Sequence, residues 1–205
     1  MDDRNTMTND VFDIVNNIVN DNSQILAYVQ NLASESRVDR QKSAAVIEAV
    51  ASRDANLLTD YIDNIVAALD CREPQTRWDC FDALCYIVPL ESRLCDKAIV
   101  PAEASLFDEK SGAVRLAAFR FLCTIGATTA RRSLKVWPLL DEALQCYHGD
   151  SEYAELLQAL SSFAEGKIDK EVVEEIVKRL SFDAENFSSN MINNRSRTIV
   201  ANLVK

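Results

Sequence analysis

One apolar pattern occurs four times along the chain, and it limits the folds that the chain can adopt. Each copy places apolar residues 4, 7 and 10 positions after its starting residue, which defines one face of an α-helix. The starting residues are spaced 37, 38 and 38 positions apart: Arg40, Arg77, Arg115 and Tyr153. A leucine 29 positions after the first three starts marks a second helix in each unit: Leu69, Leu106 and Leu144. We therefore predict an all-α chain of stacked helix pairs.

The composition agrees with this prediction. The 205 residues include only four Gly and four Pro, whereas all-β folds use many of both in their turns. Hydrophobic residues make up 48% of the chain, which is enough to form a core.

Two stretches carry a more specific motif. One runs from Leu69-Asp70 through Pro74 and Arg77 to Ala83-Leu84, and the other from Val100-Pro101 through Asp108 and Val114-Arg115 to Ile125-Gly126. Both resemble repeats of the HEAT/armadillo class, and the resemblance covers roughly residues 22–183. It implies a right-handed α-α superhelix of about five helix pairs with a C-terminal capping helix. It also implies a ladder of Asp–Arg bonds between repeats, which we assign to Asp70, Arg77, Asp108 and Arg115.

The fourth unit departs from this motif, because Cys146 and Tyr153 stand where the Asp and Arg would be, and we expect the ladder to break there. We interpret residues 1–205 as a single repeat domain. A capping helix pair is predicted over 9–35, four repeats over 37–183 and a closing helix over 187–204. Terminal repeats must expose a polar face to solvent, and the ends of this chain carry polar residues.

Charge is distributed unevenly between the two helices of each repeat. The net charge of −10 argues against nucleic acid and anionic membranes as partners, since both require clustered Lys and Arg. The resemblance implies that the second helices line the concave surface, and these helices carry 13 acidic and 5 basic residues, a net charge of −8. We therefore predict an acidic groove that binds a basic or amphipathic protein segment, with these candidate residues: Asp63, Glu103, Asp141, Glu142, Glu174 and Trp78.

Arg131 and Arg132 form a contrasting basic feature. We expect them at the turn between the two helices of the third repeat, where an anion could be held. A solvated turn whose charges suit a helix C-terminus is the alternative.

No pattern of catalytic or metal-binding residues emerges. The chain has no CxxC motif and one histidine, His148, which argues against a zinc site and against cofactors. We interpret His148-Gly149 as a helix C-cap and most of the six Cys as core residues. Of the two tryptophans, Trp137 is predicted to be in the core and Trp78 to be partly exposed.

We therefore predict a cytoplasmic, non-enzymatic interaction module (an adaptor, scaffold or inhibitor) that is a monomer or weak dimer. One alternative is an immunity-type inhibitor of a basic toxin, which charge complementarity would favour. Another is an enzyme on the same fold, such as a DNA glycosylase or a bilin lyase. The acidic groove counts against the glycosylase, and no motif supports the lyase.

Overall fold

The computed structural model describes residues 3–186 and 190–204, and within these ranges the chain forms helices and no strand. The chain divides into two compact units, Met1–Pro101 and Ala102–Lys205, and each is described by itself. The prediction of a single domain, with its repeat boundaries, stays a prediction.

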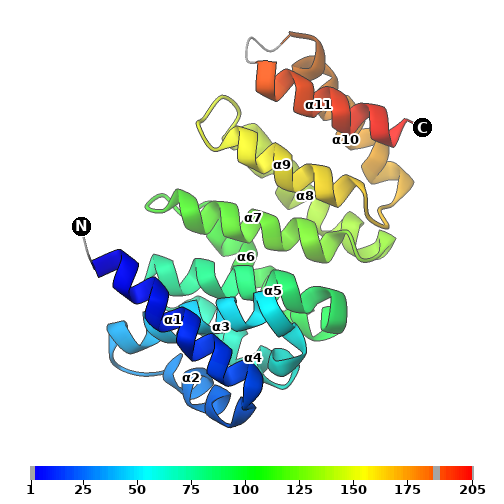
Figure 1. The fold of residues 1–205 in the computed structure, drawn as a ribbon. Coiled ribbons are helices and arrows are strands. Elements are labelled where there is room, and N and C mark those ends of the chain that lie inside the picture. The colour runs from blue at the N-terminus through cyan, green and yellow to red at the C-terminus, as the bar shows by residue number, and fades with distance from the viewer. Residues whose placement is uncertain (1–2, 187–189, 205) are drawn as a thin grey trace. The chain divides into compact units, whose positions relative to one another are not determined.

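Unit 1 has two layers of helices (Figure 1). Its first layer consists of α1 (Asp3–Asn20), α3 (Arg37–Asp54) and α5 (Pro74–Cys95), and α3 packs against both of the others. The second layer contains α2 (Ile25–Asn31) and α4 (Ile62–Ala67), which pack on α3 and α5 respectively. Short 3₁₀ segments complete it: η1 (Asn22–Gln24), η2 (Ala55–Tyr61), η3 (Ala68–Asp70) and η4 (Asp96–Ala98).

Unit 2 repeats this arrangement after α6 (Ile99–Leu106), the helix in which the division between the units falls. Its first layer consists of α7 (Gly112–Gly126), α9 (Tyr153–Ala164) and α11 (Asn190–Leu203), with α9 packed between the other two. The second layer consists of α8 (Ala130–Cys146) and α10 (Lys170–Asn186), which contact each other.

Side-chain caps fix where several of these helices begin. Ser36, Ser111 and Thr129 each accept a hydrogen bond from a backbone N–H three residues later, at the first turns of α3, α7 and α8. Such caps satisfy N–H groups that the helix itself leaves without partners. Pro74 opens α5, where its missing N–H costs little.

The apolar repeat pattern forms the core, as predicted. The residues at its three positions in α5, α7 and α9 are fully buried: Phe81, Leu84, Ile87, Phe119, Leu122, Ile125, Leu157, Leu160 and Phe163. Trp137 is also buried, and its ring lies nearly parallel to that of Phe163, with 6.4 Å between centroids. A methyl group on Gly126 would lie 2.4 Å from Val136 Cγ2, so this glycine allows α7 and α8 to approach closely.

Some element boundaries differ from those predicted. Arg131 and Arg132, predicted at a turn, lie inside α8, because Thr129 caps that helix and it begins at Ala130. The leading helix α1 begins at Asp3 rather than residue 9, and the closing helix α11 begins at Asn190. The first three residues predicted for the closing helix, 187–189, lie outside the described residues.

Candidate functional site

Arg115 connects two successive helices of the first layer in unit 2. From the first turn of α7, its Nη2 and Nε donate to the Glu152 carboxylate at 2.7 and 3.2 Å, and Nη1 donates to the Asp108 carbonyl at 2.6 Å. Its guanidinium also lies over the Tyr147 ring, 5.0 Å from the centroid. Gly112 makes room for this pair, because a Cβ there would lie 2.0 Å from Glu152 Oε1.

Arg40 makes the equivalent connection in unit 1. Its guanidinium pairs with the Glu73 carboxylate, just before α5, and donates to the Ser34 and Glu35 carbonyls before α3. Hydrogen bonding to Arg40 holds the pKa of Glu73 below its usual value. The same device therefore joins successive repeats in both units.

The predicted ladder used Asp rather than Glu as the acid. Arg115 bonds Glu152 through its side chain but Asp108 only through the backbone carbonyl, while the Asp108 carboxylate accepts from the N–H groups of Lys110 and Ser111. The ladder roles of Asp70 and Arg77 stay predictions.

At the predicted break in the ladder, Tyr153 makes a hydrogen bond where Arg40 and Arg115 form ion pairs in their repeats. Tyr153 stands at the Arg position and donates from its hydroxyl to Asp183 Oδ2 at 2.5 Å, while His148 Nε2 lies 2.9 Å from Asp183 Oδ1. Both Tyr153 and Asp183 are buried, and burial followed by the hydrogen bond to Asp183 raises the pKa of the phenol. His148 therefore ties its turn to α10 through its side chain, which the capping interpretation did not include.

Three of the predicted groove acids are exposed on alternate helices of the chain: Glu103 on α6, Glu142 on α8 and Glu174 on α10. Two others are in ion pairs with a base from the following repeat. Asp141 accepts from Arg179 Nε at 2.5 Å and Nη2 at 2.8 Å, and Asp63 pairs with Lys97 at 2.6 Å.

The second layer is less acidic at its surface than the sequence count indicated. Asp183, counted among its acids, is buried, and Arg131 and Arg132 belong to α8 rather than to a turn. Arg131 is exposed, and Arg132 donates to the Thr128 hydroxyl at 3.1 Å. Their role as an anion site stays a prediction.

A cluster of carboxylates in unit 1, not identified from the sequence, joins α3 to α5. Asp79 and Asp82 lie one turn apart on α5, near Glu48 of α3. Burial, followed by the charges of Glu48 and Asp82, raises the pKa of Asp79 to about 7, and its Oδ2 is buried without a hydrogen-bond partner. Burial and the Asp82 charge likewise raise the pKa of Glu48. We call these three residues the α3–α5 acid cluster.

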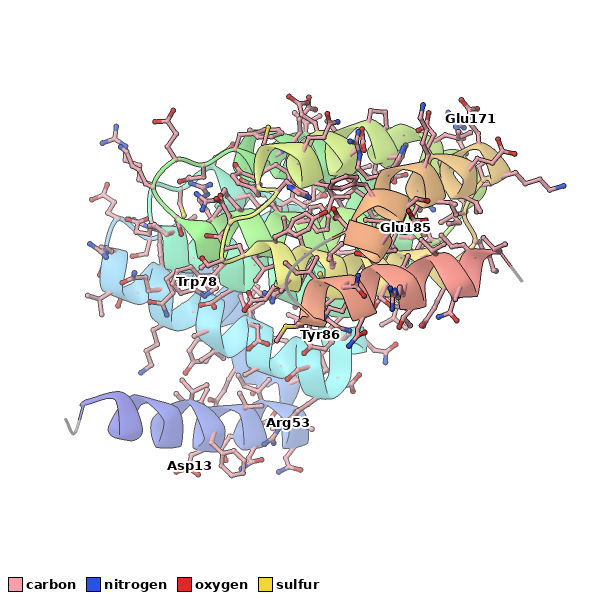
Figure 2. All side chains as sticks on the ribbon, turned by 90° about the horizontal axis from the view of Figure 1, so that it is seen from above. Asp13, Arg53, Trp78, Tyr86, Glu171 and Glu185 are labelled. Carbon is pink, nitrogen blue, oxygen red and sulfur yellow. The ribbon has the colours of Figure 1, made fainter. Side chains whose placement is uncertain are left out.

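Trp78 lies beside this cluster rather than among the groove acids. It is half buried on α5, in the first layer. Its hydrogen bond with Asp79 partly offsets the rise in the pKa of Asp79 that burial causes. Tyr86, two turns further along α5, is 46% exposed (Figure 2). No shared repeat position reveals the cluster in the sequence, since Glu48 and Asp82 stand 8 and 5 residues after successive repeat arginines.

Two adjoining pockets lie between α8 and α10 in unit 2. Trp137, Asp141, Glu175 and Lys178 line one, with a volume of about 360 Å³, and Leu144, Gln145, His148 and Asp183 line the other. Arg179 and Phe182 line both. We call the combined hollow the α8–α10 groove.

The part of the chain that the structure describes contains neither a metal-binding cluster nor a membrane-spanning helix. No group of three or more His, Cys, Asp or Glu side chains there could hold a metal ion. No helix within the same ranges has the length and hydropathy needed to cross a membrane.

Comparison with known proteins identifies the fold. No family model matches the chain, and no curated protein matches it significantly. A designed armadillo repeat protein in complex with the peptide (KR)4 superposes with a TM-score of 0.75 at 14% identity, covering 92% of this chain and 85% of that one.

Two natural proteins also superpose well. The armadillo repeats only protein from Plasmodium falciparum has a TM-score of 0.64 at 12% identity, covering 92% of this chain and 95% of its own. The HEAT-like repeats protein from the archaeon Thermococcus onnurineus NA1 has a TM-score of 0.57 at 11% identity, covering 95% and 92%. The chain therefore has the fold of the armadillo and HEAT-like helical repeat proteins.

Proposed function

We propose that the protein is a non-enzymatic interaction module of the cytoplasm that binds a basic segment of another protein. The observation that carries the proposal is the series of exposed glutamates on α6, α8 and α10 in unit 2. Glu103, Glu142 and Glu174 stand on α6, α8 and α10, and none of the three forms an ion pair with another described residue. Such a series presents negative charge at intervals along an extended surface.

The charge of the whole chain and the fold support the same partner class. The net charge of −10 favours a basic partner over nucleic acid. Among the structural neighbours, a designed armadillo repeat protein was solved with (KR)4, a peptide of alternating Lys and Arg. The (KR)4 complex is a property of that designed protein, and the charges of this chain carry the proposal.

Binding of a fluorescein-labelled (KR)4 peptide to the full chain, followed by fluorescence anisotropy, tests the proposal. We expect saturable binding that weakens as salt is raised from 50 to 300 mM, because exposed charges attract each other over about 10 Å at 0.1 M salt and over shorter distances as salt is added. The triple variant Glu103→Lys, Glu142→Lys, Glu174→Lys should bind at least about tenfold more weakly, equivalent to about 1.4 kcal/mol.

Glu155 provides a matched control. It is exposed in the same unit but lies on α9, in the first layer. Glu155→Lys should lower the affinity far less than the triple variant does. Equal losses would mean that net charge alone drives binding, and absence of binding to the unmodified protein would refute the proposed function.

A further inference from the structure

Phe182 is a large apolar side chain that is exposed in the second layer of unit 2. It lies on α10, is 64% exposed and borders both halves of the α8–α10 groove. The groove also contains a buried aromatic side chain, since Trp137 lines the same half as Asp141 and Glu175. An exposed phenylalanine beside a hollow is a typical anchor point for an apolar side chain of a partner.

The positive charge of Arg179 in the groove is largely neutralised by Asp141, which lines the same groove. Arg179 makes a two-point hydrogen-bonded pair with Asp141, and these bonds raise the pKa of its guanidinium. The pair holds Arg179, which lines both pockets, against Asp141, which lines one of them. A ligand that relied on Arg179 as an anion receptor would have to displace Asp141.

The surroundings of the groove add negative charge. Glu171, Glu174 and Glu175 on α10 and Glu142 on α8 are exposed, and none forms an ion pair with another described residue. Lys178 is the exposed base that lines the groove beside them. Figure 2 marks Glu171 and Glu185 near the two ends of α10, so acids flank the groove along this helix.

We infer that the α8–α10 groove binds a basic peptide segment through a single aromatic or large aliphatic side chain, which packs between Trp137 and Phe182. The Lys and Arg residues next to that anchor lie against Glu142, Glu171 and Glu175. This inference rests on the proposed function and deepens it. It adds an apolar anchor and a location to a partner defined so far only by charge.

Intrinsic tryptophan fluorescence can report on binding at the groove, because Trp137 lines it. The chain has two tryptophans, so Trp78→Phe leaves Trp137 as the sole reporter, at the groove itself. Three fluorescein-free synthetic peptides serve as probes: Lys-Arg repeats with one central Phe, the same repeats without Phe, and an acidic peptide with the same Phe. The full chain is titrated with each, and the Trp137 emission gives the dissociation constant.

We expect the basic peptide with Phe to bind at least about tenfold more tightly than the basic peptide without it, and to shift the Trp137 emission. Phe182→Ala should remove that advantage. Phe12→Ala is the matched control, because Phe12 is 56% exposed on α1, in the other unit. Circular dichroism of each variant confirms that the helices remain folded.

The outcomes distinguish a failure of the groove inference from a failure of the proposed function. If both basic peptides bind equally and Phe182→Ala changes neither, the groove inference is overturned while the proposed function stands. If the acidic peptide with Phe binds as well as the basic one, the charge part of the inference is wrong. If neither basic peptide binds, the proposed function fails, and the groove inference fails with it.

Discussion

Replacing Asp79 with asparagine should stabilise the protein at pH 8 and not at pH 4. The carboxylate sits in the α3–α5 acid cluster, where burial and the charges of Glu48 and Asp82 raise its pKa from 3.8 to about 7. Asparagine has nearly the same shape and carries no charge. The substitution therefore removes the cost of ionising this site while keeping its packing.

The sign follows from proton linkage. Because the pKa in the folded state is higher than in the unfolded state, the folded protein binds the proton more tightly between about pH 4 and pH 7. Stability due to this group is greatest below pH 4 and falls as the pH rises to 7. A difference of about three pKa units corresponds to at most about 4 kcal/mol.

Two hydrogen bonds reduce the expected gain. Bonds to Gln75 and Trp78 favour the charged form of Asp79, and asparagine would weaken them. Each is worth about 0.5–1.5 kcal/mol. We therefore expect Asp79→Asn to raise the free energy of unfolding by about 2 kcal/mol at pH 8, and to lower it slightly at pH 4.

Urea denaturation followed by circular dichroism at pH 4, 6 and 8 measures this difference for the two proteins. Glu48→Gln should also stabilise at pH 8, because it removes a charge that raises the pKa of Asp79. In the Asp79→Asn background the same Glu48 change should give a smaller gain, since the two effects are coupled. A pH-independent effect of Asp79→Asn would refute the electrostatic reasoning.

Three further substitutions test the packing of unit 2 by urea denaturation. Tyr153→Phe should cost about 2 kcal/mol, because it removes a hydrogen bond to the buried Asp183 carboxylate, and an unchanged midpoint would contradict that role. Gly112→Ala should destabilise the protein by about 1 kcal/mol, because the added methyl group would displace Glu152 from its pair with Arg115. In a Glu152→Ala background the same substitution should instead stabilise the protein, since alanine favours the helix more than glycine does. Gly126→Ala should cost about 1–3 kcal/mol by overpacking against Val136 and Phe163; a neutral effect would show that these side chains move aside.

The helices and their buried faces could be predicted because their signal is periodic. A residue such as Phe119 is apolar, recurs at a fixed offset and is fully buried, so pattern and position agree. Helix starts were less accessible. Arg131 and Arg132 were predicted at a turn, but Thr129 caps α8 just before them and the helix continues through Pro138.

The bonds between repeats could be predicted in kind but not in detail. Glu73 stands four residues before Arg77, whereas Glu152 stands one residue before Tyr153, so no single offset identifies both acids. The offsets differ because α5 starts three residues before its repeat arginine and α9 starts at Tyr153 itself. Only the three-dimensional path of each loop shows which carboxylate reaches the guanidinium of the preceding repeat.

The candidate surfaces were the least predictable from sequence, because they depend on which charges find partners. Asp141 and Glu142 are adjacent acids in the sequence, yet Asp141 is in an ion pair with Arg179 while Glu142 is exposed. Asp183 looks like another surface acid but is buried between Tyr153 and His148. A paired or buried carboxylate attracts a partner much less than an exposed one. A count of acids in the sequence therefore overstates the negative charge that the surface offers to a partner. The exposed glutamates and the exposed Phe182 make up the binding surface that we propose.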